Sequence, residues 1–552
     1  MAYGLPHCIS GTPKFPSAEL NSLASNQGDL AAWKELLVKR GYDAVAEVTG
    51  DFAIALRDDK GRVFLAVDRF AVCTLCYQVH DGELRFAVRA DDLADAATEI
   101  DQQAIFDYLY FHIIPSPRTI FKGIYRLPPG HFAVFENGSL TVKPYWVATF
   151  SEPAKPSFET LKNEFRELLQ AAVADRLDGG KPGCFLSGGT DSSTVAGMIG
   201  AVSGQSASTY SIGFEAEGYD EMAYARIAAR HFKTDHHEYY VTPDDLVRSI
   251  PRVAQHFDQP FGNSSALPAY YCAKMAKEDG VSRILAGDGG DELFGGNTRY
   301  AKQKVFGFYQ HVPNVFRQAL LEPILLKSPL GTMPILKKGA GYIRQVQIPL
   351  PKRMQVYNLL YRLGIEQVFT ADFLAQIDQQ EPDEQQRKVW QEAVTPADTN
   401  RQLAFDWRYT LAECDLPKVV MTAQLANLDV GFPMLDQRLL DFSLRLPVDY
   451  KVKGFKLRWF FKEALRGFLP DEILTKKKQG FGLPFGVWTA KHNALKTLAE
   501  DSVRGLVERK IMRQDFVEAL FSRYLYEHPG YYGEMIWIAM MLEQWFRGRS
   551  VR

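Results

Sequence analysis

The sequence has little cysteine, almost no net charge and no long apolar run. Six cysteines in 552 residues are too few for a disulfide framework. A formal net charge of −2 offers no basic field for nucleic acid or an anionic membrane surface. No stretch approaches the ~20 apolar residues that cross a bilayer. The N-terminus also has no basic region followed by an apolar run, so we expect a cytoplasmic protein.

Two short patterns that could suggest a metal site are better explained as structure. Cys73 and Cys76 form a lone Cys-x-x-Cys. Because a zinc site needs four ligands, we expect both to be core thiols. His236 and His237 are neighbours in a predicted strand. Adjacent side chains of a strand point to opposite faces, which suits a chelate poorly, so we also interpret these histidines as structural.

The composition indicates a large folded protein. Apolar residues make up 46% of the chain, enough for a sizeable core and for two or more domains. Residues 45–145 alternate short apolar runs with turns, and Asn137-Gly138 is a hairpin signal. A polar, proline-containing segment at 151–157 has the composition of a linker. We therefore expect one domain at 1–150 and a second at 157–552.

The second region begins with a helical pattern over about 158–176 and then alternates strands with helices up to about residue 300. This alternation predicts an α/β fold with a parallel, doubly wound sheet. Beyond residue 300 the pattern is mostly helical. Strands are predicted at 183–186, 207–214, 236–241 and 283–286.

The first predicted strand ends in a loop suited to phosphate. Gly188 and Gly189 form the turn, and Asp191 opens a helix. Such a loop presents backbone N–H groups and hydroxyls at a helix N-terminus, where the helix dipole favours anions. Asp191 suits a phosphate-bound Mg²⁺ rather than a bare phosphate. No Gly-Lys-Ser/Thr follows, so the loop is similar to those of enzymes that cleave ATP to AMP and pyrophosphate, the alternative being an ordinary Gly-Ser turn.

A second loop rich in glycine and acidic residues, 286–292, follows a later strand. Ligands of open α/β sheets bind at the carboxyl ends of the strands. We therefore expect Asp191, Asp288 and Asp291 to converge on one pocket. Carboxylates in that arrangement could hold Mg²⁺ ions that bridge the phosphates of ATP.

Together these motifs resemble the asparagine synthetase family over most of the chain. The N-terminal region is similar to the glutaminase domain of that family at 50–53 and 128–131. The resemblance implies an N-terminal, β-rich sandwich of the Ntn-hydrolase type and a C-terminal ATP-pyrophosphatase domain with a parallel sheet and a helical extension. The C-terminal motifs that carry the resemblance are 187–193, 210–214, 219–221, 236–238, 287–296, 416–418, 432–436 and 476–484.

The resemblance implies a reaction in two steps: ATP adenylates a carboxylate, and an amine attacks the acyl-adenylate to give an amide, AMP and pyrophosphate. Asp191 and Asp291 would hold Mg²⁺, and Asp288 would assist formation of the acyl-adenylate. Lys478 would neutralise charge that develops on the phosphate and the leaving group. The residues implied to bind ATP are Leu186, Ser187, Gly188, Gly189, Asp191, Ser192, Ser193, Ile212 and Gly287.

Two departures from the family pattern bear on the substrates. Residue 2 is alanine, where the glutaminase of the family has its nucleophilic cysteine. We therefore expect the N-terminal domain to be a remnant that cannot hydrolyse glutamine. In the acceptor region, the Ser-Leu-Glu-Val-Arg-x-Pro of the family is replaced by a segment with Asp429 and Gly431. Because glycine lacks the planar fork of arginine that suits a carboxylate, the change disfavours aspartate as the substrate.

Two functions fit these features. The first is an AMP-forming amide ligase that joins a small-molecule or peptide carboxylate to ammonia or another amine. The second is an intramolecular cyclase similar to β-lactam synthetases or lasso-peptide macrolactam cyclases, in which one substrate supplies both groups. β-Lactam synthetases use a catalytic glutamate from a helix, and Glu413 and Asp415 lie in the corresponding region here.

A catalytically inactive scaffold is a third hypothesis, against which Asp191, Asp291 and Lys478 argue. We expect ATP and Mg²⁺ as cofactors and neither nucleic acid nor a membrane as a partner. A homodimer, a precursor peptide and companion biosynthetic proteins are partners that fit the two enzymatic functions.

Overall fold

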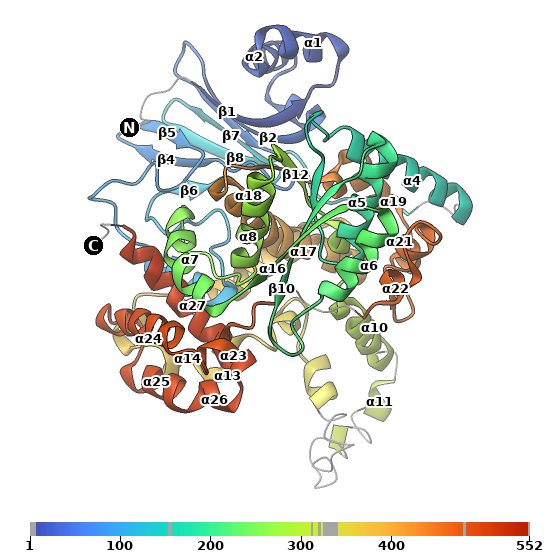
Figure 1. The fold of residues 1–552 in the computed structure, drawn as a ribbon. Coiled ribbons are helices and arrows are strands. Elements are labelled where there is room, and N and C mark those ends of the chain that lie inside the picture. The colour runs from blue at the N-terminus through green and yellow to red at the C-terminus, as the bar shows by residue number, and fades with distance from the viewer. Residues whose placement is uncertain are drawn as a thin grey trace.

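The computed structural model describes residues 7–152, 157–310, 313–317, 322–323, 341–477 and 482–549. The described chain forms an antiparallel N-terminal region, a parallel-sheet region and a large set of C-terminal helices (Figure 1). This arrangement confirms the predicted α/β fold class. No helix within the described ranges is both long and apolar enough to cross a membrane.

The N-terminal region contains two antiparallel sheets with the strand orders β1-β2-β3-β7-β8 and β5-β4-β6. Phe64 of the central strand joins an apolar cluster with helix residue Trp33, whereas its neighbour Leu65 faces Leu84 of the second sheet. The sheets therefore form a sandwich, with α2 packed on the outer face of the first sheet and α3 in the core cluster beside the second. The elements are β1 (His7–Lys14), α1 (Ala18–Gln27), α2 (Asp29–Arg40), β2 (Thr49–Arg57), β3 (Val63–Val67), β4 (Cys76–His80), β5 (Glu83–Ala87), α3 (Gln102–Phe111), β6 (Tyr125–Arg126), β7 (His131–Glu136) and β8 (Ser139–Pro144).

Local sequence explains the turn between β7 and β8. Asn137 and Gly138 join the two strands, and their φ angles are +52° and +76°. A two-residue turn with positive φ at both positions matches the twist of the strands, and Asn-Gly is the pair that adopts it most readily. The predicted hairpin is confirmed.

The second region contains a five-stranded parallel sheet with the order β11-β10-β9-β12-β13. The four predicted strands are present, each within one residue of its expected ends, and β13 is an additional edge strand. The elements are α4 (Phe158–Ala174), β9 (Gly183–Phe185), α5 (Thr190–Ser203), β10 (Ser208–Phe214), α6 (Met222–Phe232), β11 (Asp235–Val241), α7 (Pro243–His256), α8 (Ala266–Glu278), β12 (Arg283–Leu285), α9 (Gly290–Phe294), α10 (Thr298–Gln310), α11 (Asn314–Phe316) and β13 (Asp429–Gly431).

Helices cover both faces of this sheet. Tyr210 and Ile212 of β10 join a core with α7 and α8, whereas Cys184 of β9 joins another core with α5 and α6. Figure 1 shows α5 and α6 on one side of the strands and α7 and α8 on the other. Helices on both faces explain why every residue of the inner strand β10 is buried, whereas the edge strand β11 is mostly half-buried or exposed.

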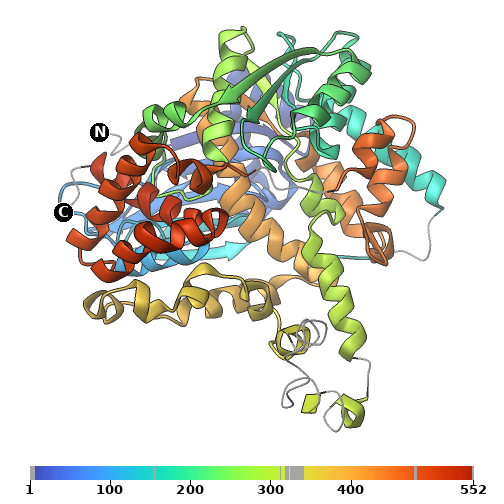
Figure 2. The same cartoon turned by 60° about the horizontal axis from the view of Figure 1, so that its bottom comes forward.

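The C-terminal helices lie against both preceding regions. Figure 2 shows the last helices, in red, beside the blue and cyan strands of the N-terminal region. The Tyr108 hydroxyl of α3 donates a hydrogen bond to the Ile538 carbonyl of α27 (2.9 Å), and Trp545 of α27 donates to the carbonyl of Phe257, which follows α7 (3.1 Å). Buried Arg126 of β6 pairs with Asp258 (2.8 Å) and joins the N-terminal region to the parallel-sheet region. The remaining elements are α13 (Leu359–Leu363), α14 (Ile365–Val368), α15 (Ala371–Leu374), α16 (Glu381–Glu392), α17 (Asp398–Asp406), α18 (Leu416–Leu425), α19 (Gln437–Arg445), α20 (Val448–Lys451), β14 (Val452–Lys453), β15 (Lys456–Leu457), α21 (Trp459–Ala464), α22 (Asp471–Thr475), α23 (Phe485–Thr489), α24 (Asn493–Glu508), α25 (Gln514–Ala519), α26 (Leu525–Glu527) and α27 (Pro529–Arg547).

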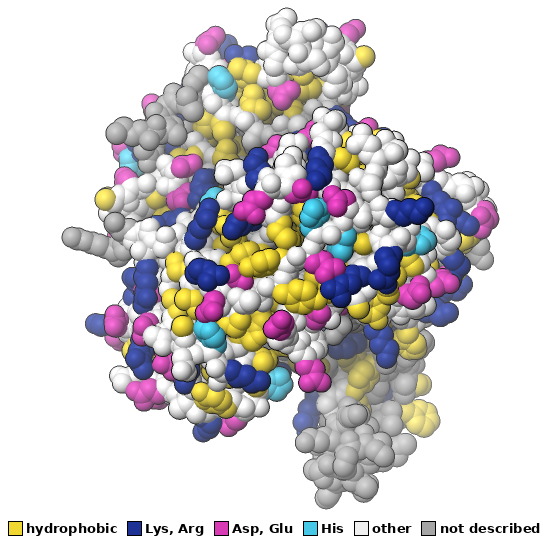
Figure 3. Space-filling model, in the orientation of Figure 1, with side chains coloured by type: hydrophobic (Ala, Val, Ile, Leu, Met, Phe, Trp, Pro, Cys, Tyr) yellow, Lys and Arg dark blue, Asp and Glu magenta, His cyan; other side chains and the backbone are white. Residues whose placement is uncertain are grey.

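Charges of both signs are mixed on the surface. Figure 3 shows Lys and Arg side chains interspersed with Asp and Glu across the face that it presents. This distribution matches the near-zero net charge of the sequence. The face in view therefore presents no single-sign field of the kind that attracts polyanions.

Candidate active site

A cavity of about 670 Å³ opens at the carboxyl edge of the parallel sheet. This is the edge where open α/β sheets bind their ligands, and the volume suits a ligand of nucleotide size. The lining comes from the loops after β9 and β12, the end of β10, and helices far along the chain. Nine residues predicted from the sequence lie in this lining: Leu186, Ser187, Gly189, Asp191, Ser192, Ile212, Gly287, Asp288 and Asp291.

The loop after β9 turns sharply into α5. Gly188 has a φ of +69°, and a Cβ at this position would collide with the backbone of Ala225. Ser187 N–H donates to Ser192 Oγ (3.2 Å), which fixes the loop against the first turn of the helix. Thr190, Asp191 and Ser192 of that turn line the cavity, and the first N–H groups of a helix have no partner within the helix, so a phosphate chain could lie here. Gly188 and Ser193 are not among the lining residues, so Gly188 shapes the loop rather than contacting the cavity.

Asp191 and Asp291 meet at one point. Nη1 of Arg458 lies 2.6 Å from an oxygen of Asp191 and 2.7 Å from an oxygen of Asp291. Two glycines make this approach possible, because a Cβ at Gly290 or Gly296 would overlap the carboxylate of Asp191 or Asp291. Two converging carboxylates around a bound cation are a donor set that fits Mg²⁺. The residues predicted as metal ligands are therefore brought together, although the cation between them is a guanidinium.

A second charged group lines the same cavity. Lys418 Nζ lies 2.9 Å from Asp415 Oδ1 and 3.8 Å from Asp288 Oδ1. Burial raises the pKa of Asp288 to about 6, and the charge of Lys418 partly opposes that rise. Burial disfavours the charged form of Lys418, but Asp415 and Asp288 together raise its pKa above the ordinary value. Lys418 therefore stays protonated, while Asp288 titrates near neutral pH.

The helix that supplies Asp415 and Lys418 is irregular. Residues 407–415 form a π-helical stretch between α17 and α18. Glu413, which the sequence suggested as catalytic, is buried and does not line the cavity. Its carboxylate accepts a hydrogen bond from Ser116 Oγ (2.5 Å) and pairs with Arg408 Nε at 3.1 Å. From this region the carboxylate that reaches the cavity is Asp415.

Cations line the side of the cavity near α5. Arg458, Lys462, Lys476 and Lys477 all contribute to the lining. Lys476 Nζ lies 3.1 Å from Glu221 Oε1 and 3.4 Å from the carbonyl of Gly188. The predicted catalytic Lys478 lies outside the described residues. The sequence did not suggest Arg458 or Lys462 as site residues. Of the basic residues on this side of the cavity, only those in the run 476–478 were predicted to take part.

The thiols of the N-terminal region are not activated. Burial, and then the charge of Asp92, raises the pKa of Cys8. Burial, and then Asp68, raises the pKa of Cys73 well above its ordinary value. A nucleophilic thiol requires the opposite shift, because the thiolate is the reactive form. Cys76 is buried, as predicted for a core thiol, whereas Cys73 is only partly buried, beside the core between the two sheets.

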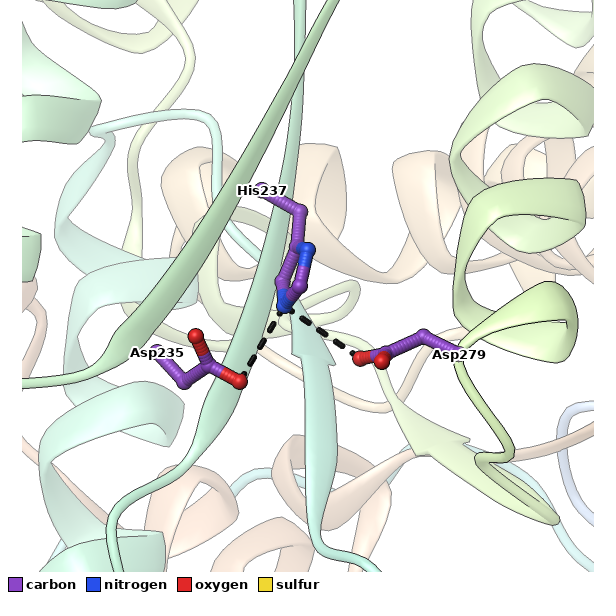
Figure 4. Close-up of side chains that lie close together, drawn as sticks. All are labelled: Asp235, His237 and Asp279. Carbon is purple, nitrogen blue, oxygen red and sulfur yellow. Dashed lines mark ion pairs between the residues drawn. The ribbon is translucent and has the colours of Figure 1, made fainter.

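A different cluster of ligand-type side chains lies at the amino edge of the sheet (Figure 4). His237 Nε2 lies 3.2 Å from Asp235 Oδ2 and 3.3 Å from Asp279 Oδ2. Lys181 Nζ is 2.6 Å from the same oxygen of Asp279. Since Lys181 already neutralises these carboxylates, we interpret the cluster as an ion network. His236 points the other way, to Thr209 Oγ1 (2.9 Å), in agreement with the structural role expected for both histidines.

Comparisons with known proteins agree with this architecture. The sequence model described as Asparagine synthase matches residues 164–547, and the one described as Glutamine amidotransferase domain matches residues 21–146. Asparagine synthetase (glutamine-hydrolyzing) 1 of Bacillus subtilis (strain 168) is 25% identical over 471 residues, 84% of this chain and 72% of the relative. Amidase chry2 of Gibberella zeae is 23% identical over 546 residues, 88% of this chain and 77% of the relative.

Proposed function

Since the chain belongs to the asparagine synthase family, a family of ATP-dependent amide ligases, we propose that it activates a carboxylate as an acyl-adenylate and transfers the acyl group to an amine. In the first step a carboxylate oxygen attacks the α-phosphorus of ATP, and pyrophosphate leaves. In the second step the amine attacks the acyl carbon, AMP leaves, and the nitrogen loses a proton. The observation that carries this proposal is the meeting of the two predicted loops and their three aspartates at one cavity.

The residues divide into two functional groups. The loop 187–193 and the N-terminus of α5 would bind the pyrophosphate part of ATP, and Leu186, Ile212 and Gly287 would line the nucleoside pocket. Mg²⁺, held by Asp191 and Asp291, would neutralise charge on the phosphates. Lys476 and Lys477 line the same side, where fixed cations favour the departure of pyrophosphate. Lys478 keeps the same proposed role.

The resemblance links Asp288 to formation of the acyl-adenylate, and we propose that it also acts in the second step, as the proton acceptor. Its carboxylate lines the cavity, and its pKa of about 6 leaves it mostly ionised at neutral pH yet basic enough to take a proton. Lys418 would hold Asp288 in place and stabilise its ionised form. Asp415 takes, in this proposal, the part that the sequence suggested for Glu413, because its side chain reaches the cavity.

The nitrogen is proposed to come from free ammonia or a substrate amine rather than from glutamine hydrolysed on this chain. The raised pKa values of Cys8 and Cys73 support this, because neither thiol is a ready nucleophile. Supplying glutamine or ammonium salt as the nitrogen source tests it directly. Amide formation with ammonium alone supports the proposal, whereas release of glutamate from glutamine contradicts it.

Exchange of labelled pyrophosphate into ATP tests the activation step, because reversible acyl-adenylate formation produces exchange before any amine is added. We expect exchange that depends on a carboxylate and is lost in Asp191→Asn. Candidate carboxylates should include small acids and linear peptides with an internal Asp or Glu. A peptide product lighter by one water in the absence of added amine would identify the intramolecular cyclase instead. No exchange with any carboxylate, together with ATP cleavage to ADP, would remove the proposal.

A further inference from the structure

Arg458 sits where a metal ion would be expected. Its side chain is 5% exposed and pairs with Asp191 and Asp291, while Nη1 also donates to Thr190 Oγ1 at 2.7 Å. The guanidinium lies over the Phe461 ring, 4.0 Å from its centre. A side chain of this protein therefore supplies a cation between the two carboxylates.

The guanidinium and a metal ion cannot share this point. Mg²⁺ binds carboxylate oxygens at about 2.0–2.1 Å, and Mn²⁺ has the same preference for carboxylate and water ligands. The Nη1 atom lies 2.6 Å and 2.7 Å from the two oxygens that such an ion would use. An ion coordinated by both Asp191 and Asp291 would therefore overlap the nitrogen, so that metal binding requires the guanidinium to leave.

The backbone of Arg458 is held independently of its side chain. Arg458 follows β15 and precedes α21, with a φ of +54°, and its N–H donates to the Gly295 carbonyl at 3.2 Å. Its Nε–H is buried and has no acceptor among the described residues. A buried donor without a partner costs free energy, so this arrangement of the side chain is not fully satisfied. The cavity beside it is the space proposed for the phosphates of ATP.

We propose that Arg458 is a cation placeholder: it holds the metal-binding carboxylates together before the metal arrives, then exchanges with the metal and turns to the phosphate chain. The inference rests on the proposed function for the identity of the ligand. The exchange keeps a positive charge between Asp191 and Asp291 at every stage. The released guanidinium has the planar fork that binds phosphate oxygens in pairs, which a lysine lacks.

The test is Mn²⁺ binding to the full chain without nucleotide, measured by electron paramagnetic resonance of the free ion. Arg458→Met removes the competing cation, so the affinity for Mn²⁺ should rise roughly tenfold, a change of the size usual for coupled binding events in proteins. Lys462→Met removes a charge from the same cavity but not the ion pairs, and should change the affinity less than about threefold. The double variant Arg458→Met with Asp191→Asn should lose the gain.

Unchanged or weaker Mn²⁺ binding by folded Arg458→Met overturns the proposal, and so does an equal gain in Lys462→Met. A labelling experiment on the wild-type protein covers the case in which the variant does not fold. Phenylglyoxal should modify Arg458 faster with Mn²⁺ present than without it, and added ATP should then protect it, as read by mass spectrometry of peptides. Labelling that Mn²⁺ leaves unchanged or slows contradicts the exchange. Because no step needs ligase turnover, either result is independent of the pyrophosphate exchange assay.

Discussion

Lys418 should set the pH at which the amide-forming step becomes fast. Burial raises the pKa of Asp288 to about 6 even with Lys418 3.8 Å away. A carboxyl group with that pKa is about 10% ionised at pH 5 and about 90% ionised at pH 7. If ionised Asp288 accepts the proton from the attacking amine, kcat/KM per free amine should rise about tenfold between these pH values.

The variant Lys418→Met removes the cation that opposes the rise in the pKa of Asp288. Unit charges about 4 Å apart interact by about 4 kcal/mol at an effective dielectric constant of about 20, or about three pKa units. The repulsion from Asp415, which lies 2.9 Å from Lys418, remains in the variant and does not offset this rise. We therefore expect the acid limb, the rise of the rate at low pH, to move up by at least about one pH unit. Lys418→Arg keeps the charge and should leave the limb near pH 6.

The assay is the initial rate of AMP formation from pH 5 to 8 at saturating ATP and carboxylate, with the amine varied. Asp288→Asn should abolish the rise of the rate at low pH and lower the rate about a hundredfold, as expected for loss of a general base. An acid limb at the same pH in wild type and Lys418→Met would refute the reasoning. A limb that persists in Asp288→Asn would assign it to a different group.

Three further predictions concern the loops and the fold. Gly290→Ala should lower the affinity for MgATP in a nucleotide titration, because the new Cβ would displace the carboxylate of Asp191. Burial lowers the pKa of Lys451 to about 7, whereas a lysine in an unfolded chain has a pKa of about 10.4. Between these values the native state binds fewer protons than the unfolded state, so the free energy of unfolding should rise by about 2 kcal/mol between pH 7 and 9. Lys451→Met should flatten this rise in urea denaturation. Asp258→Ala leaves the buried charge of Arg126 unpaired where the N-terminal region meets the parallel-sheet region. It should lower the free energy of unfolding in urea by about 3 kcal/mol, and a loss below about 1 kcal/mol would contradict a buried pair.

The parts of the site that lie in continuous segments could be predicted from the sequence. The strands before the two loops are apolar and bounded by glycine or polar residues, so the positions of Asp191 and Asp291 followed from the rule for carboxyl edges. The edge strand β13 could not be predicted, because its three residues carry no alternation of their own. Pairing with β12, whose residues lie 146 positions earlier in the chain, defines it.

The parts that come from distant helices could not be read from the sequence. Glu413 and Asp415 are two residues apart on one helical run, so their side chains point in very different directions. Periodicity alone does not show which direction faces the cavity, and the π-helical stretch shifts the phase further. Arg458 gave no signal because its role depends on a left-handed backbone conformation that few sequence patterns predict for arginine.

The measurement that tests the central claim most directly is the fate of ¹⁸O from a labelled substrate carboxylate. The carboxylate that supports pyrophosphate exchange would be labelled with ¹⁸O and converted to amide with MgATP and amine. The account predicts one ¹⁸O atom in the AMP released, because the carboxylate oxygen that attacks the α-phosphorus stays with AMP. AMP without label, or ADP and labelled phosphate as the products, would contradict it.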